Sequence, residues 1–178
     1  MRPAIGISDV HRFAVVRTHH GDERAWRALL LALEAEYARY GSRPSRFLFV
    51  DDPGWAGATP EEVLEAVRDG DAEAVFLADE EALSEEESWP LLTVYAPLPD
   101  EEPRPSEETL FRTGLDMVYY VDTNLSTGNT DVADFAAGAH EAPDGVLRFA
   151  AYFGQGRPQY PDASGPRFSF TPQALNLP

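Results

Sequence analysis

The alternation of apolar and polar segments along the chain predicts a domain in which strands and helices alternate. The short apolar runs are long enough only for strands, and they stand at residues 13–16, 47–50, 74–77 and 91–95. After the first run, large apolar residues recur every three or four positions from Trp26 to Tyr40, which predicts a helix with one buried face. Asp22 is its expected N-cap, and Gly41 its expected end.

A second helix is marked by a capping box, in which the first and fourth residues satisfy each other's backbone groups. The box is Thr59-Pro60-Glu61-Glu62, and Val63, Leu64 and Val67 follow it as a buried stripe. Strands alternating with helices favour the α/β class. We therefore expect a single layered α/β domain over residues 1–150, with a mainly parallel or mixed sheet of four to six strands and flanking helices.

The pattern is weaker after Ala96. Residues 109–112 fit a short edge strand, residues 115–120 fit a strand or a helix, and residues 131–137 fit a short helix. The polar stretch that starts at Asp122 superficially resembles a calcium-binding loop, but an EF-hand loop needs Gly at its sixth position and Glu at its twelfth. Thr127 and Ala133 stand there, so we expect a tight turn and no metal site. Residues 145–149 fit a last strand.

The C-terminal extension, residues 151–178, is rich in proline and aromatic residues. Its prolines predict an irregular segment, and its aromatic side chains need a surface to cover. We expect it to pack on its own domain or on a neighbouring subunit, and in the second case the protein would form a homo-oligomer through it.

The charge of the chain is concentrated in one third of its length. The formal net charge is −17, with 31 acidic and 14 basic residues. Residues 51–108 hold 19 of the acids and two arginines, so this stretch carries the whole imbalance. Such acidity disfavours direct binding to nucleic acid or to a membrane surface. The chain has no cysteine, which favours a cytoplasmic protein, and no lysine, which excludes every mechanism that uses an ε-amine.

A candidate site lies at the strand ends. If the first three strands are parallel, their carboxyl ends meet at one edge, where open α/β sheets bind their ligands. The residues brought there are Arg17, Thr18, His19, Asp51, Asp52 and Asp79. Carboxylates, a hydroxyl and an imidazole suit a site that holds Mg²⁺, with Arg17 binding an anion. The alternative is structural, because acids at strand ends commonly cap the next turn.

A second candidate is a docking surface for a basic protein partner. It consists of an acidic run with a tryptophan at either side, which could anchor an interface: Trp55, Glu80, Glu81, Glu85, Glu86, Glu87 and Trp89. A further acidic run, residues 100–102, is expected on the same side of the domain.

Several short segments, in this order and spacing, resemble an actinobacterial family known as a domain of unknown function. They are Val16-Arg17-Thr18, Asp22, Ala25-Trp26, Val50-Asp51-Asp52-Pro53, Thr59-Pro60-Glu61-Glu62, Leu77-Ala78-Asp79, Asn124-Leu125-Ser126-x-Gly128-Asn129-x-Asp131, Phe135 and Asp144-Gly145-Val146-Leu147-Arg148. The resemblance spans about residues 13–149 and implies one domain with no established activity or catalytic residues. The pattern is also loosely similar to that of bacterial immunity proteins.

Two hypotheses follow. The first is a non-catalytic acidic module that binds a basic protein partner, in an inhibitor-like, immunity-like or accessory role. The second is a small enzyme or ligand-binding domain that uses the strand-end residues, with Mg²⁺ as its cofactor.

Overall fold

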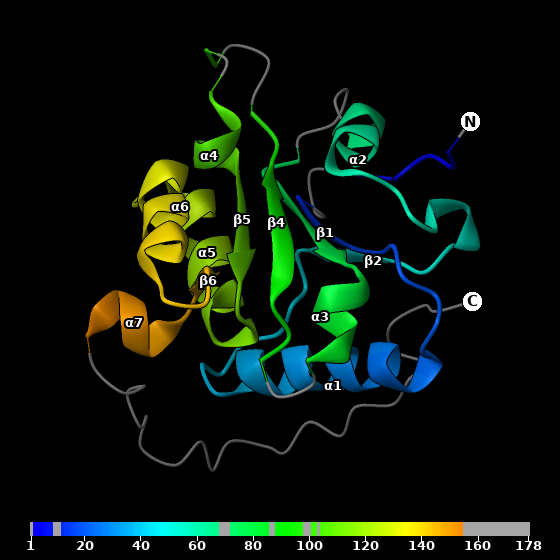
Figure 1. Ribbon diagram of the computed structural model, residues 1–178, viewed down its shortest axis with the longest axis horizontal. Coiled ribbons are helices and arrows are strands. Elements are labelled where there is room, and N and C mark those ends of the chain that lie inside the picture. Colours follow the sequence, from blue (N-terminus) through cyan, green and yellow to red (C-terminus); the bar gives the residue numbers. More distant parts are fainter. Residues whose placement is uncertain are drawn as a thin grey trace.

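Six strands pair into one mixed sheet in the order β2-β1-β3-β4-β5-β6. The computed structural model describes residues 2–8, 12–67, 72–85, 88–97, 101–102 and 104–154 (Figure 1). The strands are β1 (Phe13–Arg17), β2 (Phe47–Val50), β3 (Ala74–Ala78), β4 (Leu91–Tyr95), β5 (Leu110–Thr113) and β6 (Val146–Leu147). This confirms the predicted α/β class with a mixed sheet.

The strands at the centre of the sheet are buried along their whole length, which explains their continuous apolar sequences. β1 lies between β2 and β3 and runs parallel to both. The chain then reverses, since β4 is antiparallel to β3 and β5 is antiparallel to β4. The short β6 pairs in parallel with β5, so β5 is not the edge strand that its sequence suggested.

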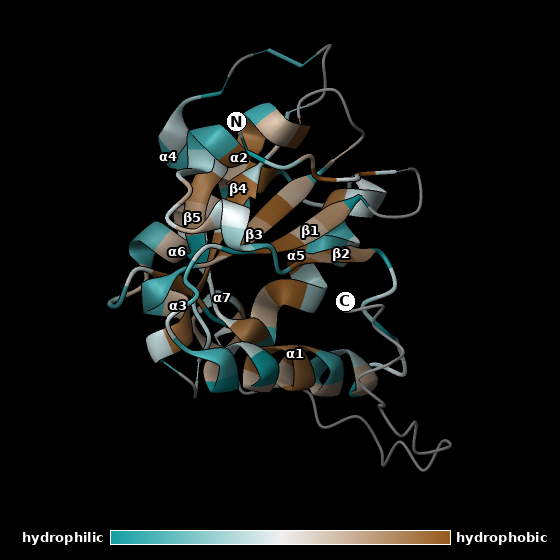
Figure 2. Ribbon diagram, turned by 90° about the vertical axis from the view of Figure 1, so that its right-hand side faces the viewer, coloured by the Kyte–Doolittle hydropathy of each residue, from teal (hydrophilic) through white to brown (hydrophobic). Residues whose placement is uncertain are grey.

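Helices cover both faces of the sheet. The helices are α1 (Glu23–Ala38), α2 (Pro60–Val67), α3 (Glu80–Ser84), α4 (Ser106–Thr109), α5 (Leu115–Thr127), α6 (Val132–Glu141) and α7 (Phe149–Phe153), with a 3₁₀ turn, η1 (Pro53–Trp55). Figures 1 and 2 show the strands lying between α1 and α2. The apolar residues of α1, α3, α5 and α6 share one core, whereas α2 and η1 share a second, smaller one.

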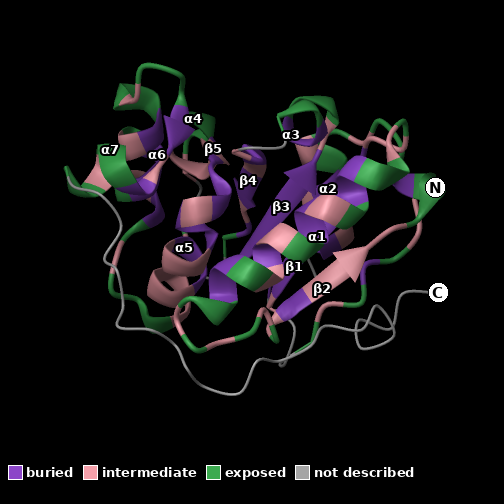
Figure 3. Ribbon diagram, turned by 90° about the horizontal axis from the view of Figure 1, so that it is seen from below, coloured by how far each residue is buried: buried purple, intermediate pink, exposed green. Residues whose placement is uncertain are grey.

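The larger core explains why α1 forms where its periodicity predicts it. Trp26, Leu29, Leu33 and Tyr37 are at most 1% exposed and pack towards the strands, and Figure 3 shows the buried sheet beneath this helix. Each such side chain contributes about 1.5–3 kcal/mol through burial of apolar surface. The N-cap is also as predicted, since Asp22 accepts a hydrogen bond from the Ala25 amide at 2.9 Å.

The predicted capping box is present at the start of α2. The Thr59 amide donates to Oε2 of Glu62 at 3.0 Å, and the Glu62 amide donates to Oγ1 of Thr59 at 3.3 Å. Arg2 adds a second contact, because its Nη2 lies 2.8 Å from the same carboxylate. The N-terminal residues are thereby held against the α2 side of the sheet.

The polar stretch from Asp122 is a helix where the sequence suggested a tight turn. α5 continues to Thr127 because three of its polar side chains donate to carbonyls one turn earlier: Asn124 to Tyr120, Ser126 to Asp122, and Thr127 to Thr123. These bonds satisfy groups that would otherwise favour a loop. The turn comes only at Gly128, whose φ of 64° is the left-handed conformation that glycine adopts easily.

The chain is helical beyond residue 150, since α7 runs to Phe153. Residues 155–178 lie outside the described part of the chain, so the packing of the C-terminal extension stays a prediction. Within the residues that the structure does describe, no helix combines the length and the apolar character that crossing a membrane requires.

Candidate functional site

The carboxyl ends of β1, β2 and β3 meet at one edge of the sheet, because the three strands are parallel and adjacent. We call this the carboxyl edge, and define it by residues 17–23, 51–55 and 79–85. It contains all six residues of the predicted strand-end site. The opposite end of the same strands is the amino edge.

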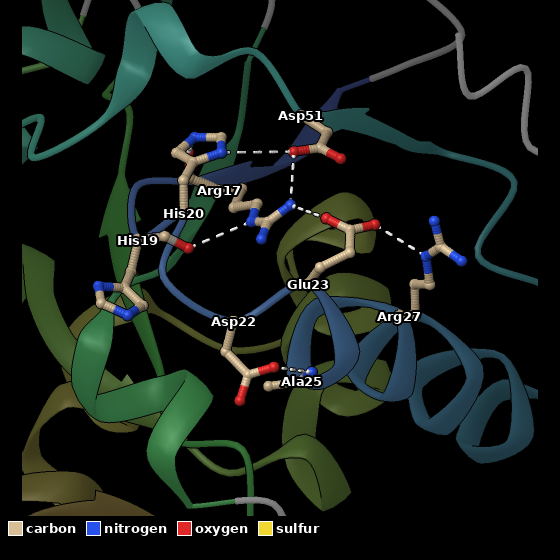
Figure 4. Close-up of polar contacts among 8 residues, drawn as sticks. All are labelled: Arg17, His19, His20, Asp22, Glu23, Ala25, Arg27 and Asp51. Atoms are coloured by element: carbon tan, nitrogen blue, oxygen red, sulfur yellow. Dashed lines mark hydrogen bonds and ion pairs between the residues drawn. The ribbon is translucent and has the colours of Figure 1, made fainter.

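Arg17 is the buried centre of the carboxyl edge. Its Nη1 donates to Oε2 of Glu23 at 2.7 Å and to Oδ1 of Asp51 at 3.0 Å, and its Nε donates to the His19 carbonyl at 3.1 Å (Figure 4). The guanidinium lies 5.7 Å from the centre of the Trp26 ring, and the side chain is only 3% exposed. Arg17 therefore ties two strands to the first turn of α1 through its Nη1 and Nε.

The ion pair between Arg17 and Glu23 has an electrostatic consequence. The hydrogen bond from Arg17, followed by that from Arg27, lowers the pKa of the Glu23 carboxyl below its ordinary value. Glu23 was not among the predicted site residues, although its place one residue after the helix cap brings it to the same edge.

Two adjacent histidines, His19 and His20, lie in the turn before α1, and both are partly buried. Nε2 of His20 lies 3.2 Å from the Arg17 carbonyl oxygen, and Nδ1 lies 3.7 Å from Oδ1 of Asp51. A Cβ added at Gly21 would be 2.5 Å from Nε2 of His19. The glycine therefore leaves room for the His19 ring.

Thr18 is held by its backbone between the neighbouring strand ends. Its amide donates to the Ala78 carbonyl at 3.1 Å, and its carbonyl accepts from the Gly57 amide at 2.8 Å. The side chain is buried, with 6% of the residue exposed. Thr18 thus joins the exits of β1, β2 and β3.

Asp79 has a structural role at the end of β3. Its Oδ1 accepts from the Ala82 amide at 3.0 Å and caps α3. Both of its oxygens also bind Arg112, at 2.9 and 2.7 Å, and Arg112 forms a second ion pair with Glu81 at 2.8 Å. Arg112 was not among the predicted site residues. The signal was a charged residue inside a short strand, which usually requires a buried or half-buried partner.

Asp52 also acts as a cap. Its Oδ1 accepts from the Gly54 amide at 2.8 Å at the start of η1, and its side chain is exposed. Among the residues that the structure describes, no three or more His, Asp or Glu side chains gather in a way that could hold a metal ion. The strand-end residues are thus brought together as predicted, but mainly as partners of one another and of the backbone.

The two tryptophans proposed as interface anchors belong to the protein core, which corrects that expectation. Trp55 is 0% exposed and packs in the smaller core, and Trp89 is 4% exposed and packs in the larger one. Trp89 holds this place with a left-handed backbone, φ 44°, a conformation that costs about 1–2 kcal/mol in a non-glycine residue. Burial of the indole is large enough to offset that cost.

The acids of α3 remain on the surface. Glu80, Glu81 and Glu85 are exposed, and they stand at the same edge as Asp51 and Asp52. The next two acids of the run, Glu86 and Glu87, lie outside the described residues.

The second acidic run is not on this side, contrary to expectation. β4 runs back from the carboxyl edge and ends at Tyr95, which pairs with Ala74 at the start of β3. The Tyr95 hydroxyl donates to Glu101, at 2.8 Å to Oε2, so this acid lies at the amino edge. Figure 1 shows α3 and α4, which flank β4 and this run, at opposite ends of the sheet.

Two hollows lie away from the carboxyl edge. One, of about 330 Å³, is at the amino edge and is lined by Glu73, Tyr95 and Arg104 among others. The other, of about 480 Å³, lies between α6 and α7. Neither includes Arg17, Asp51 or Asp79 in its lining.

The fold and the carboxyl edge define a single mixed-sheet α/β domain with an acidic strand-end surface. The chain belongs to the family described as a domain of unknown function, DUF6924, which matches residues 12–150. Comparison with curated proteins and with solved structures gave no match.

Proposed function

We propose that this protein is a non-catalytic interaction domain that binds a basic protein partner through the carboxyl edge. The observation that supports the proposal most strongly is the convergence of two groups of acids at this edge. Glu80 and Glu81 of α3 and the next acid, Glu85, follow β3, whereas Asp51 and Asp52 follow β2. Both groups therefore lie at this edge, with β1 between their strands, although almost 30 residues separate them in the chain.

The balance of charge at the carboxyl edge supports a basic partner. Its described residues and the first turns of α1 hold eight acids and three arginines, Arg17, Arg24 and Arg27, and Arg112 reaches the edge from β5. Arg17 is buried, and Arg27 and Arg112 are paired with acids of this surface. A surface of one sign attracts a partner of the opposite sign and accelerates its encounter.

The hydrogen bonds of the strand-end residues support a role without catalysis. A catalytic acid or base needs a side chain that can reach a substrate. The carboxylates of Asp51 and Asp79 bind Arg17 and Arg112, and Asp52 caps η1. The competing hypothesis of a small, Mg²⁺-dependent enzyme would have to break these contacts, and the experiment below separates the two.

The proposal also includes a cytoplasmic location and an actinobacterial source. The first rests on the cysteine-free composition, and the second on the sequence resemblance alone.

The test is an affinity capture from a lysate of the source cells with the full-length protein as bait. Glu80→Lys combined with Glu85→Lys reverses the charge at two exposed positions of the carboxyl edge. Glu102→Lys combined with Glu107→Lys is the matched control at the other end of the sheet. We expect a basic protein to be captured by the wild type and the control, and its association to slow at least about tenfold with the edge variant. Higher salt should weaken the capture.

Equal capture by both variants would contradict the proposal. A second result would also contradict it: the purified protein turns over a small molecule, and Asp51→Ala abolishes this turnover while capture is unchanged. That result identifies the strand ends as a catalytic site.

A further inference from the structure

A groove between α6 and α7 lies away from the carboxyl edge. It has a volume of about 480 Å³. Its lining combines the small residues Ala137, Gly138 and Ala142 with the ring of Tyr152. A Cβ added at Gly138 would be 2.7 Å from Cδ2 of Tyr152, so the glycine sets how closely the two helices approach. Figures 1 and 3 both show α6 and α7 side by side.

The polar groups of this groove fit a cation on an apolar stem. Asp134 and Glu141 are seven residues apart on α6, which places them on the same side of the helix two turns apart. Both are exposed, and neither forms an ion pair with any other residue in the described ranges. Burial, and then the nearby Asp134 charge, raise the pKa of the Tyr152 hydroxyl, so the ring and at least one carboxylate share the groove. Two carboxylates beside an aromatic face suit an arginine or lysine side chain.

We propose that the occupant is the C-terminal extension of this same chain, residues 155–178, with Arg157 placed between Asp134 and Glu141. The described chain ends beside the groove, because α7 supplies Ala151 and Tyr152 to its lining and stops at Gly154. Gly154 has a φ of 64°, a left-handed cap that turns the chain away from the helix axis. Arg157 is three residues further on and can reach about 10 Å from there.

The charge of the extension complements the groove. In a chain of net charge −17, residues 155–178 carry two arginines, Arg157 and Arg167, and one acid, Asp162. The segment is therefore net basic, whereas the rest of the chain is strongly acidic.

The prolines of the extension favour the same docking. Pro158 and Pro161 have the spacing of segments that adopt the extended polyproline conformation, which docks on aromatic side chains at a low entropic cost. Phe153, at the end of α7, is 41% exposed and contacts the rings of Tyr120 and Phe149 in tilted arrangements, with ring centres 5.2 and 4.6 Å apart. Because the extension is tethered here, its local concentration is in the millimolar range.

The absence of cysteine from the chain makes a direct test possible. Ala137→Cys places a thiol on the groove, and Gln159→Cys places one on the extension, two residues beyond Arg157. Under mild oxidation we expect a disulfide within one chain, detected by intact mass and by peptide mapping. The matched control combines Gln159→Cys with Leu31→Cys, since Leu31 is 51% exposed on α1. We expect the control to cross-link far more slowly.

A second comparison links the cross-link to the proposed contact. Arg157→Gln, or Asp134→Asn with Glu141→Gln, should slow the cross-link about three- to tenfold, as expected for the loss of exposed ion pairs. Cross-linking between two chains would overturn the proposal in favour of a neighbouring subunit. Equal rates for the groove and control pairs, or rates unchanged by these three charge substitutions, would overturn it as well. Hydrogen exchange on the full chain without cysteines is an independent test. Arg157→Gln should increase the exchange rates of the amides of α6 and α7.

Discussion

The Tyr37 hydroxyl donates a hydrogen bond of 2.6 Å to Oδ2 of Asp122, joining α1 to α5 across 85 residues of sequence. Both side chains are buried. Nη2 of Arg46 lies 2.8 Å from the other carboxylate oxygen, so the buried charge has both a cation and a hydroxyl beside it. This contact joins two helices of the larger core.

Removal of either side of this contact should destabilise the fold to different extents. Tyr37→Phe loses one hydrogen bond and should cost about 1 kcal/mol or more, because the carboxylate stays buried. Asp122→Ala leaves the buried Tyr37 hydroxyl without its acceptor and should cost about 1–3 kcal/mol, whereas the partly exposed Arg46 can turn to solvent. Urea unfolding followed by circular dichroism measures both, and Leu31→Ala, at an exposed site on α1, is the control with almost no expected effect.

The stability should depend on pH through Asp122. Burial raises the pKa of this carboxyl above its ordinary value, although Tyr37, Arg46 and Ser126 act in the opposite direction. The folded chain therefore holds this proton more tightly than the unfolded chain does. Its contribution to stability is fully present below about pH 3.9, the ordinary value, and is lost as the pH rises through the folded-state pKa.

Asp122→Asn removes this titration and isolates its effect. The free energy of unfolding of the Asn variant, relative to the wild type, should rise between about pH 4 and pH 7. Urea titrations at several pH values give this difference directly. A difference that falls over the same range would mean that the hydrogen bonds to Asp122 outweigh its burial.

Arg17→Gln should destabilise the carboxyl edge by removing its buried guanidinium. The variant removes the shared cation of Glu23 and Asp51 and should destabilise the fold by about 1–3 kcal/mol, since a buried hydrogen-bonding centre is lost. It should also raise the pKa of Glu23 towards its ordinary value, because the Arg17 hydrogen bond is the main cause of the lowering. Carboxyl chemical shifts report this pKa, and Arg27→Gln is the control with a smaller effect. An unchanged Glu23 pKa in Arg17→Gln would contradict the described pairing.

Gly138→Ala should destabilise the protein although alanine favours helices. In an open helix interior this substitution stabilises by about 1 kcal/mol. Here the new Cβ would lie 2.7 Å from the Tyr152 ring and 3.1 Å from Cδ1 of Leu147, so α7 must shift. Such overpacking costs about 1–3 kcal/mol. Thermal unfolding checks the sign, and a stabilised variant would show that α7 moves freely.

Most of the fold could be predicted where a local pattern and its tertiary partner agree. The buried runs of β1 and β3, the Asp22 cap and the Thr59–Glu62 box follow from residues close together in sequence, and all are present. The second half of α5 could not be distinguished from a turn by sequence, because its Asn, Ser and Thr side chains suit either conformation. The helix is selected by the burial of Val118 and Val121 in the core.

The site was predictable in position but not in detail. Parallel pairing brings Arg17, Asp51 and Asp79 together, and the sequence order alone suggested that edge. The contact between Asp79 and Arg112 depends on the register of two antiparallel pairings, which no local pattern encodes. The burial of Trp55 and Trp89 likewise depends on which face of the sheet each loop returns to.

The reversal of direction between β3 and β4 divides the acidic third of the chain into two electrostatically separate surfaces. β4 spans five residues, a length of roughly 16 Å at about 3.3 Å per residue. The Debye length at physiological ionic strength is about 8 Å, so the field of one end is largely screened at the other. One antiparallel strand pair thus converts one contiguous run of charge into two surfaces that can attract different partners or evolve independently.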